Sequence, residues 1–191
     1  MLEYIIQFWE IALVAFMVLL ELVTRWIDKN RKTKNEFAFE KMPVLRPIKI
    51  PTVGKGILRG IWVWVAKSRQ WEVAEDFHYS INGVDYVIPA GFVCDATSIP
   101  KFLRTILSPT GILLIGGLVH DYGYRYTYLL KADGDTTERM SQKHLDQIFR
   151  DINIQVNGFK AINYVPYYML RLFGWFAWIQ RRKADGKWDT E

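Results

Sequence analysis

Five polar residues whose side chains could carry chemistry lie close together in the middle of the chain: Asp95, Ser98, His120, Asp121 and Tyr124. His120 follows the apolar run 112–119, so we expect it at the edge of a buried core. Polar side chains at such a position need hydrogen-bonding partners. One interpretation is that His120 and Asp121 cross-link the core through hydrogen bonds, and the other is that they belong to a reactive site.

Several of these residues also have a purely structural interpretation. Asp95 can close an Asx-turn, and either Asp95 or Ser98 can cap the helix expected to follow. Asp146 lies in a later helical segment, where it can pair with Arg139 or Arg150.

One enzymatic interpretation is a metal-dependent hydrolase that acts on peptidoglycan. Its ligands would be Asp95, His120 and either Asp121 or Asp146. Zinc sites usually use more than the one histidine of this set, and the chain contains only His78, His120 and His144. The sequence contains no HExxH, GxSxG or P-loop pattern.

Three motifs in a fixed order resemble a phage-encoded and prophage-encoded family of unknown function, whose patterns are VPxGFxxDxxSxP, HDxxY and DxxF. Here they read VIPAGFVCDATSIP at 87–100, HDYGY at 120–124 and DQIF at 146–149. The resemblance covers about residues 70–175 and implies a phage context and a candidate site, but no reaction. Leu145 replaces the usual alanine, and the hydrophobic N-terminal segment suggests a membrane-attached version.

The HDxxY spacing is also similar to the active-site helix of secreted and viral phospholipases A2. That resemblance implies that His120 is a general base, that Asp121 binds calcium, and that Asp146 orients the histidine with help from Tyr124. The expected catalytic residues are thus His120, Asp146 and Tyr124. Asp121 and Asp95 are the expected ligands of a divalent cation, calcium rather than zinc. The glycine-rich calcium loop and the disulfides of those enzymes are missing.

The composition suits one domain with an appendage, working against a membrane or inside a large assembly. The chain has 191 residues, of which 50% are hydrophobic and 15% aromatic. Its net charge of +5 favours anionic lipid or an acidic protein surface. No basic and aromatic alternation is present, so specific nucleic-acid binding is not predicted. The single Cys94 excludes an internal disulfide and is interpreted as a buried structural thiol.

Residues 4–27 are expected to form a hydrophobic helix long enough to cross a bilayer, with an apolar centre at 11–20. Glu3, Glu10 and Glu21 recur on one face of that helix. We expect this face to pack on partner helices, virion proteins or a second copy of the chain, with membrane lipid around the rest. The alternative is an amphipathic helix in a protein assembly without lipid.

Basic residues gather directly after this helix, and they are Arg25, Lys29, Arg31, Lys32 and Lys34. The positive-inside rule then places the C-terminal domain on the cytoplasmic side of a membrane, or inside a membrane-containing virion. A signal peptide is not predicted, because no basic residue precedes the apolar centre and no small-residue cleavage site follows it.

The elements that must position the candidate site follow from the patterning. Residues 29–60 are charged and carry Pro43, Pro47 and Pro51, which indicates a linker. Alternating residues begin at 61, and Asn82-Gly83 predicts a hairpin turn. Helices are expected at 101–107, 111–130, 136–152 and 161–183. Thr136 or Thr137 is the expected N-cap of the third of these helices.

The predicted fold class is α+β: a small antiparallel β-meander packed on three to four helices, plus the N-terminal hydrophobic helix. The expected divisions are an anchor helix at 1–28, a linker at 29–60, a globular domain at 61–184 and a tail at 185–191. The predicted function is a phage-encoded, membrane-associated protein or virion component with envelope-directed hydrolysis at the His-Asp site. The alternative is a non-enzymatic virion or membrane structural protein whose His-Asp-Tyr network packs the core.

Overall fold

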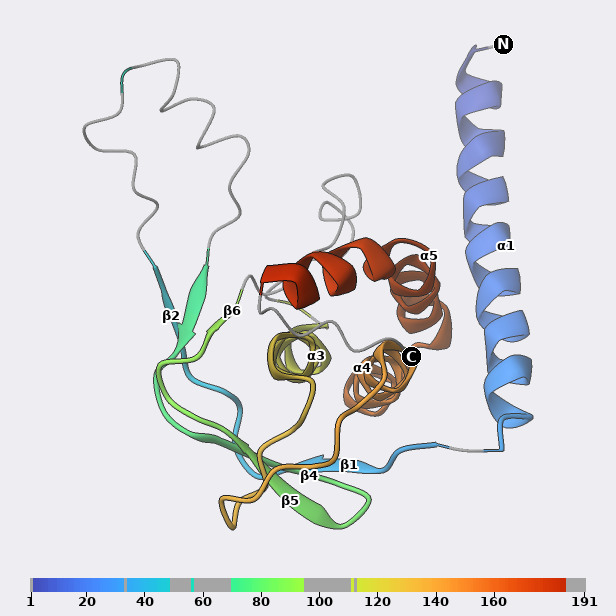
Figure 1. Ribbon diagram of the computed structural model, residues 1–191. Helices are drawn as coiled ribbons and strands as arrows, with labels where there is room; N and C mark the ends of the chain where they lie inside the picture. Colours follow the sequence, from blue (N-terminus) through green and yellow to red (C-terminus); the bar gives the residue numbers. More distant parts are fainter. Residues whose placement is uncertain are drawn as a thin grey trace.

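A computed structural model of the chain describes residues 2–32, 34–48, 56, 70–94, 111 and 113–184 (Figure 1). Its helices are α1 (Leu2–Lys29), α3 (Leu114–Tyr126), α4 (Gln142–Asn157) and α5 (Lys160–Ala184). Its strands are β1 (Phe37–Phe39), β2 (Leu45–Pro47), β3 (Trp71–Val73), β4 (Phe77–Ile81), β5 (Val84–Ile88) and β6 (Val93–Cys94). The fold is α+β, as predicted. The expected helix at 101–107 and the first alternating strand, from residue 61, lie outside the described residues.

The described strands form two three-stranded antiparallel sheets rather than one meander, in the orders β1-β4-β5 and β2-β3-β6. The predicted hairpin at Asn82-Gly83 is confirmed. Both residues have positive φ, 53° and 77°, as a two-residue turn that matches the twist of the flanking strands requires.

Residues 29–60, interpreted above as a linker, contribute an edge strand to each sheet. β1 pairs with β4, and β2 pairs with β3. Pro47 is compatible with this arrangement because it lies in β2 at the edge of the described sheet, where none of the described strands needs its missing N–H. Proline spacing alone therefore could not distinguish a linker from an edge strand.

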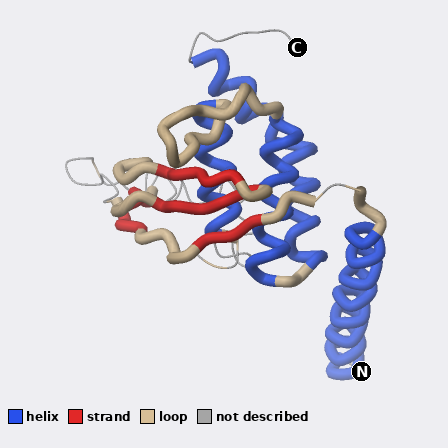
Figure 2. The backbone as a smooth tube through the Cα atoms, turned by 90° about the horizontal axis from the view of Figure 1, so that it is seen from below, coloured by secondary structure: helices blue, strands red, loops and turns tan. Residues whose placement is uncertain are grey.

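The hydrophobic core lies between the β1-β4-β5 sheet and helices α3 and α4, which form a second layer (Figure 2). The inward side chains of β4 alternate with outward ones, as expected for a strand with one buried face. Helix α3 runs through the centre, and its residues from Ile115 to Tyr124 are all buried. The polar residues of α3 therefore lie inside the domain.

Two glycines let α3 and α4 approach closely. A Cβ atom on Gly116 would lie 2.3 Å from the side-chain nitrogen of Asn153, and one on Gly123 would lie 2.4 Å from Leu145 Cδ2. Seven residues apart, they share one face of α3. The close approach brings Asp146 of α4 within hydrogen-bonding distance of α3.

Helix α4 begins later than predicted. Ser141 is its N-cap and accepts a hydrogen bond from the His144 backbone N–H at 3.3 Å. Thr136 and Thr137 were the wrong N-caps. The Thr137 hydroxyl instead accepts a hydrogen bond from the Leu129 backbone N–H at 2.9 Å. Both residues belong to the connection between α3 and α4, so this bond stabilises the connection.

Helix α1 docks on the domain only at its C-terminal end, and the rest extends away from it (Figures 1 and 2). The Glu21 carboxylate accepts hydrogen bonds from the Lys160 and Ala161 backbone N–H groups, at 3.2 and 2.8 Å. These are N–H groups of the first turn of α5, which have no partner inside their own helix. The acidic face predicted to pack on a helix thus meets, at Glu21, a helix of the same chain.

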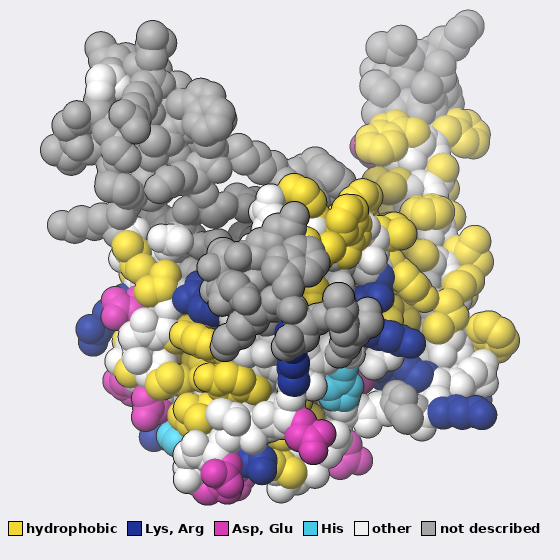
Figure 3. All heavy atoms as spheres, in the orientation of Figure 1, with side chains coloured by type: hydrophobic (Ala, Val, Ile, Leu, Met, Phe, Trp, Pro, Cys, Tyr) yellow, Lys and Arg dark blue, Asp and Glu magenta, His cyan; other side chains and the backbone are white. Residues whose placement is uncertain are grey.

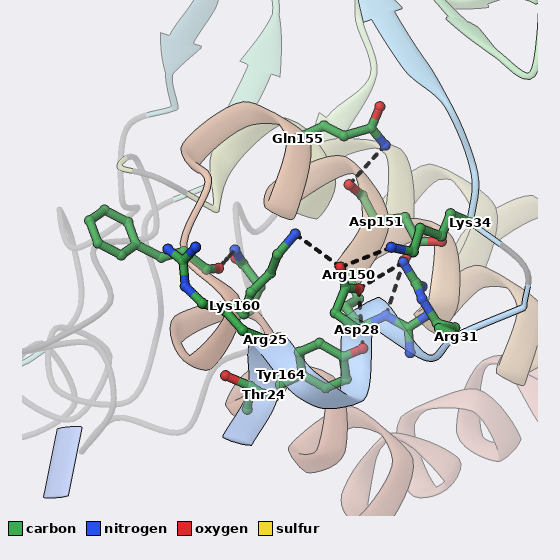
Figure 4. A network of polar contacts seen from close by, with 12 residues as sticks. Thr24, Arg25, Asp28, Arg31, Lys34, Arg150, Asp151, Gln155, Lys160 and Tyr164 are labelled. Carbon is green, nitrogen blue, oxygen red and sulfur yellow. Dashed lines mark hydrogen bonds and ion pairs between the residues drawn. The ribbon is translucent and has the colours of Figure 1, made fainter. Parts of the chain in front are cut away.

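Two buried carboxylates, Asp28 and Asp151, form ion pairs that hold the C-terminal end of α1 on the domain (Figure 4). Asp28 is paired with Arg31 at 3.1 Å, Lys160 at 3.0 Å and Lys34 at 3.3 Å. Asp151 of α4 is paired with Arg31 too, and with the neighbouring Arg150. Arg31 therefore joins both carboxylates and connects α1 to α4.

The expectation of a bilayer-crossing helix at 4–27 is not supported. Among the described residues, no helix is long and apolar enough to cross a membrane. The uncharged run of α1 between Glu10 and Glu21 spans only about 15 Å, about half of the hydrocarbon thickness of a bilayer.

Candidate active site

Three helices bring four polar side chains together in the interior. His120 and Tyr124 lie one turn apart on α3, Asp146 comes from α4, and Arg171 comes from α5. The Asp146 Oδ1 atom lies 2.9 Å from His120 Nε2 and accepts a hydrogen bond from the Tyr124 hydroxyl at 2.7 Å. The other carboxylate oxygen, Oδ2, accepts from Arg171 Nη1 at 2.9 Å. Asp146 is the centre of the network.

Aromatic rings hold this network in place. The His120 and Tyr124 rings have centroids 3.9 Å apart, and Phe149 contacts the imidazole edge-on at 5.5 Å. Trp178 of α5 packs edge-on against Tyr124 at 5.0 Å. Asp146 is fully buried with 0% exposure, and the side chain of Arg171 is 32% exposed. The carboxylate is thus sealed from solvent, and the Arg171 side chain is the partly exposed member of this pair.

The protonation of Tyr124 is set by its surroundings. Burial raises the pKa of the phenol well above its ordinary value, and the charge of Asp146 and its hydrogen bond raise it further. Tyr124 therefore stays neutral and donates a hydrogen bond to the carboxylate.

The geometry of Asp146 suits it to orient an imidazole. An ionised carboxylate that accepts a hydrogen bond from Nε2–H favours the neutral tautomer in which Nδ1 carries the lone pair. No described residue forms a hydrogen bond with Nδ1 of His120. A histidine held in this way can accept a proton from water, which is the action of a general base.

His120, Tyr124 and Asp146, the three expected catalytic residues, lie within hydrogen-bonding distance of one another through the Asp146 carboxylate. Their catalytic roles stay predictions. Asp121 is buried beside His120 on α3 and takes part in further interactions. Asp95, and Ser98 with it, lies outside the described residues.

The expected cation site is not assembled by the described residues. Among them, no group of three or more His, Cys, Asp or Glu side chains is placed to hold a metal ion. His78 of β4 and His144 of α4 are both exposed. Of the two expected ligands, Asp121 is buried on α3 and Asp95 lies outside the described residues, so the calcium site stays a prediction. Cys94 is free and buried, as the sequence indicated.

Arg171 is the site residue that the sequence did not reveal. The expected partners of Asp146 were Arg139 or Arg150, but Arg150 pairs with Asp151 and packs on the ring of Tyr167. A sequence signal did exist, because Arg171 is an isolated charge within the aromatic segment 161–180. Such a charge usually has a specific partner.

Comparison with known proteins identifies the family. The model of a family described as "Protein of unknown function (DUF1353)" matches residues 71–169, more than half of the chain. The chain belongs to the DUF1353 family. No curated protein and no solved structure matches it. The DUF1353 match starts at β3, includes His120, Tyr124 and Asp146, and ends two residues before Arg171. Helix α1 and strands β1 and β2 lie outside the matched range.

Proposed function

We propose that this DUF1353 protein is a phage-encoded, membrane-associated hydrolase directed at the envelope, in which His120 is the general base. The contact of His120 Nε2 with the fully buried Asp146 carboxylate carries the proposal. Tyr124 and Arg171 hold that carboxylate in a single orientation. Groups positioned around a histidine in this way are typical of acid–base catalysis.

The proton transfers can be followed atom by atom. Nδ1 of His120 takes a proton from water as the water oxygen attacks the carbonyl carbon of an ester or amide. Asp146 stays ionised and stabilises the imidazolium that forms. The imidazolium then returns the proton to the leaving oxygen or nitrogen. Hydrolysis completes with the base restored.

A structural role for the network is the competing proposal. It is favoured by the complete burial of Asp146 and by its saturation with donors from three different residues. A satisfied network of this kind can define how three helices pack without any turnover. If His120 is the general base, replacing it lowers the rate of hydrolysis. If the network only packs the helices, replacing His120 does not lower any rate of hydrolysis.

The test compares two histidines of the same chain. His120→Asn removes the base but keeps a polar side chain, and His144→Asn changes an exposed histidine on α4. Fatty-acid release from phosphatidylglycerol vesicles and fragment release from peptidoglycan are measured with the purified full chain. We expect His120→Asn to lower kcat/KM on one of these substrates by about 10²-fold to 10⁴-fold and His144→Asn to leave it unchanged. Equal activity of the two variants, or no turnover by the unchanged protein on either substrate, would favour the structural role.

The phage setting and the attachment to a membrane belong to the same proposal. They are supported by the ordered motifs at 87–100 and 120–124 and by the apolar helix at the N-terminus. Detection of the chain in purified virions or in the membrane fraction of infected cells would test this setting. Recovery in neither fraction would contradict it.

A further inference from the structure

Residues 11–19, between Glu10 and the docked end of α1, are apolar on every side of the helix. Four consecutive residues, Phe16, Met17, Val18 and Leu19, have exposed fractions between 42% and 60%. Successive residues of a helix point 100° apart, so these four side chains cover the whole circumference. A helix packed on one partner buries only one stripe, whereas a helix that is apolar all round is surrounded by apolar material.

Helix α5 adds a second apolar surface. Leu172, Phe173, Trp175 and Phe176 are exposed by between 53% and 63%. In Figure 3, apolar side chains cover α1 and also gather over α5, on the side toward which α1 extends. Large exposed patches on two helices mark an interaction site rather than a chance feature of the surface.

Positive charge borders the apolar side chains of α1. Arg25 has a side chain that is 58% exposed, and Lys29 and Lys32 are exposed near the end of the helix. Figure 3 shows Lys and Arg side chains at the foot of α1, below its apolar part. Together with the net charge of +5, this arrangement complements an anionic surface.

We propose that α1 and the outer face of α5 together bind an anionic lipid surface. Apolar side chains on all sides of one helix, with basic side chains at its foot, match the acyl and headgroup layers of such a surface. A second copy would cover one stripe of α1 and leave the remaining apolar side chains in water.

The same helix α5 also reaches the candidate active site, and this step rests on the proposed function. Arg171 and Gly174 face inward, where Arg171 pairs with Asp146 and a Cβ on Gly174 would lie 3.0 Å from the Tyr124 hydroxyl. Leu172, Phe173 and Phe176 face outward from the same two turns. Lipid bound on α5 thus lies about one helix diameter, about 10 Å, from the His-Asp pair. Because of this proximity, we infer that the substrate of the proposed hydrolase is a lipid.

Flotation of the protein with vesicles in a density gradient tests the surface without any need for turnover. Full-length protein is mixed with vesicles of phosphatidylcholine alone or of phosphatidylcholine with phosphatidylglycerol. We expect stronger binding to the anionic vesicles, and roughly tenfold weaker binding by Phe173→Gln/Phe176→Gln, which removes two rings from the bound surface. Glutamine is a good helix former, so α5 should persist, and circular dichroism checks it. The matched control is Met42→Gln/Val84→Thr, which changes exposed apolar residues elsewhere and should bind like the unchanged protein.

Two results would overturn the lipid surface. One is equal vesicle binding by the α5 variant and the unchanged protein. The other is no binding at all, with a discrete oligomer in gel filtration, which would assign the surface to a second copy. His120→Asn should bind vesicles like the unchanged protein. If that variant binds while the unchanged protein hydrolyses no lipid, the lipid surface stands and the enzymatic proposal fails.

Discussion

Asp146 is the residue on which the candidate site depends. Its carboxylate is fully buried, and its charge is compensated by Arg171 and by hydrogen bonds from His120 and Tyr124. A buried charge is tolerated only when its partners are in place. The same residue therefore supports both the fold and the orientation of the imidazole.

Replacing Asp146 with asparagine should destabilise the protein by roughly 1–3 kcal/mol, because Arg171 and the Tyr124 hydroxyl lose their charged acceptor. Urea denaturation measures this loss. The control is Lys143→Ala on the exposed side of the same helix, which should change stability by about 0.5 kcal/mol or less. An Asp146→Asn variant as stable as the control would show that the network contributes little to folding.

At the scale of elements, the packing of α3 on α4 requires small residues at the contact. Gly116→Ala would place a Cβ 2.3 Å from the Asn153 side chain. Alanine is intrinsically the better helix former by about 1 kcal/mol, so propensity alone predicts a gain in stability. We expect a loss of about 1–3 kcal/mol because the contact is overpacked. Thermal or urea unfolding measures the change in stability, and its sign decides between the gain expected from helix propensity and the loss expected from overpacking.

The docking of α1 should weaken in acid. Burial by itself would raise the pKa values of Glu21 and Asp28, but hydrogen bonds and nearby cations outweigh it and lower both. A lowered folded-state pKa stabilises the fold above the ordinary values of 4.5 and 3.8, and this contribution is lost as the pH falls through the folded-state values. Both carboxylates thus hold α1 in place at neutral pH.

Glu21→Gln isolates one of these carboxylates. At neutral pH the variant should be less stable by about 1 kcal/mol, since a neutral amide interacts less favourably with the first turn of α5. The difference in unfolding free energy between the two proteins should shrink as the pH drops below 4.5. A difference that is constant with pH would mean that the charge of Glu21 does not contribute to docking.

At the scale of the whole molecule, the domain is closed around its core while α1 and the outer face of α5 leave large apolar side chains exposed. Surfaces of this kind associate in water. We expect the full chain to elute from gel filtration as large, heterogeneous assemblies in plain buffer and as a single small species in mild detergent. A monomer in plain buffer would contradict the exposure of these two helices.

Some features of this protein follow from local sequence alone. The positive φ angles at Asn82 and Gly83 are demanded by a two-residue hairpin turn, so the turn could be predicted from the residue pair. His120 and Tyr124 are four residues apart, so any helix places them on one face. The α+β class likewise followed from the change of hydrophobic period along the chain.

Other features were decided only by how the elements pack in three dimensions. Arg171 is the cation for Asp146 because α5 crosses the α3–α4 pair there, not because of any spacing along the chain. Strands β1 and β2 arise from a proline-containing segment because β4 and β3 offer open edges to pair with. Glu21 is bound because the first turn of α5 has free N–H groups beside it. Local patterns specify dihedral angles and faces, whereas the partner of a charge or a strand edge depends on contacts between residues far apart in the sequence.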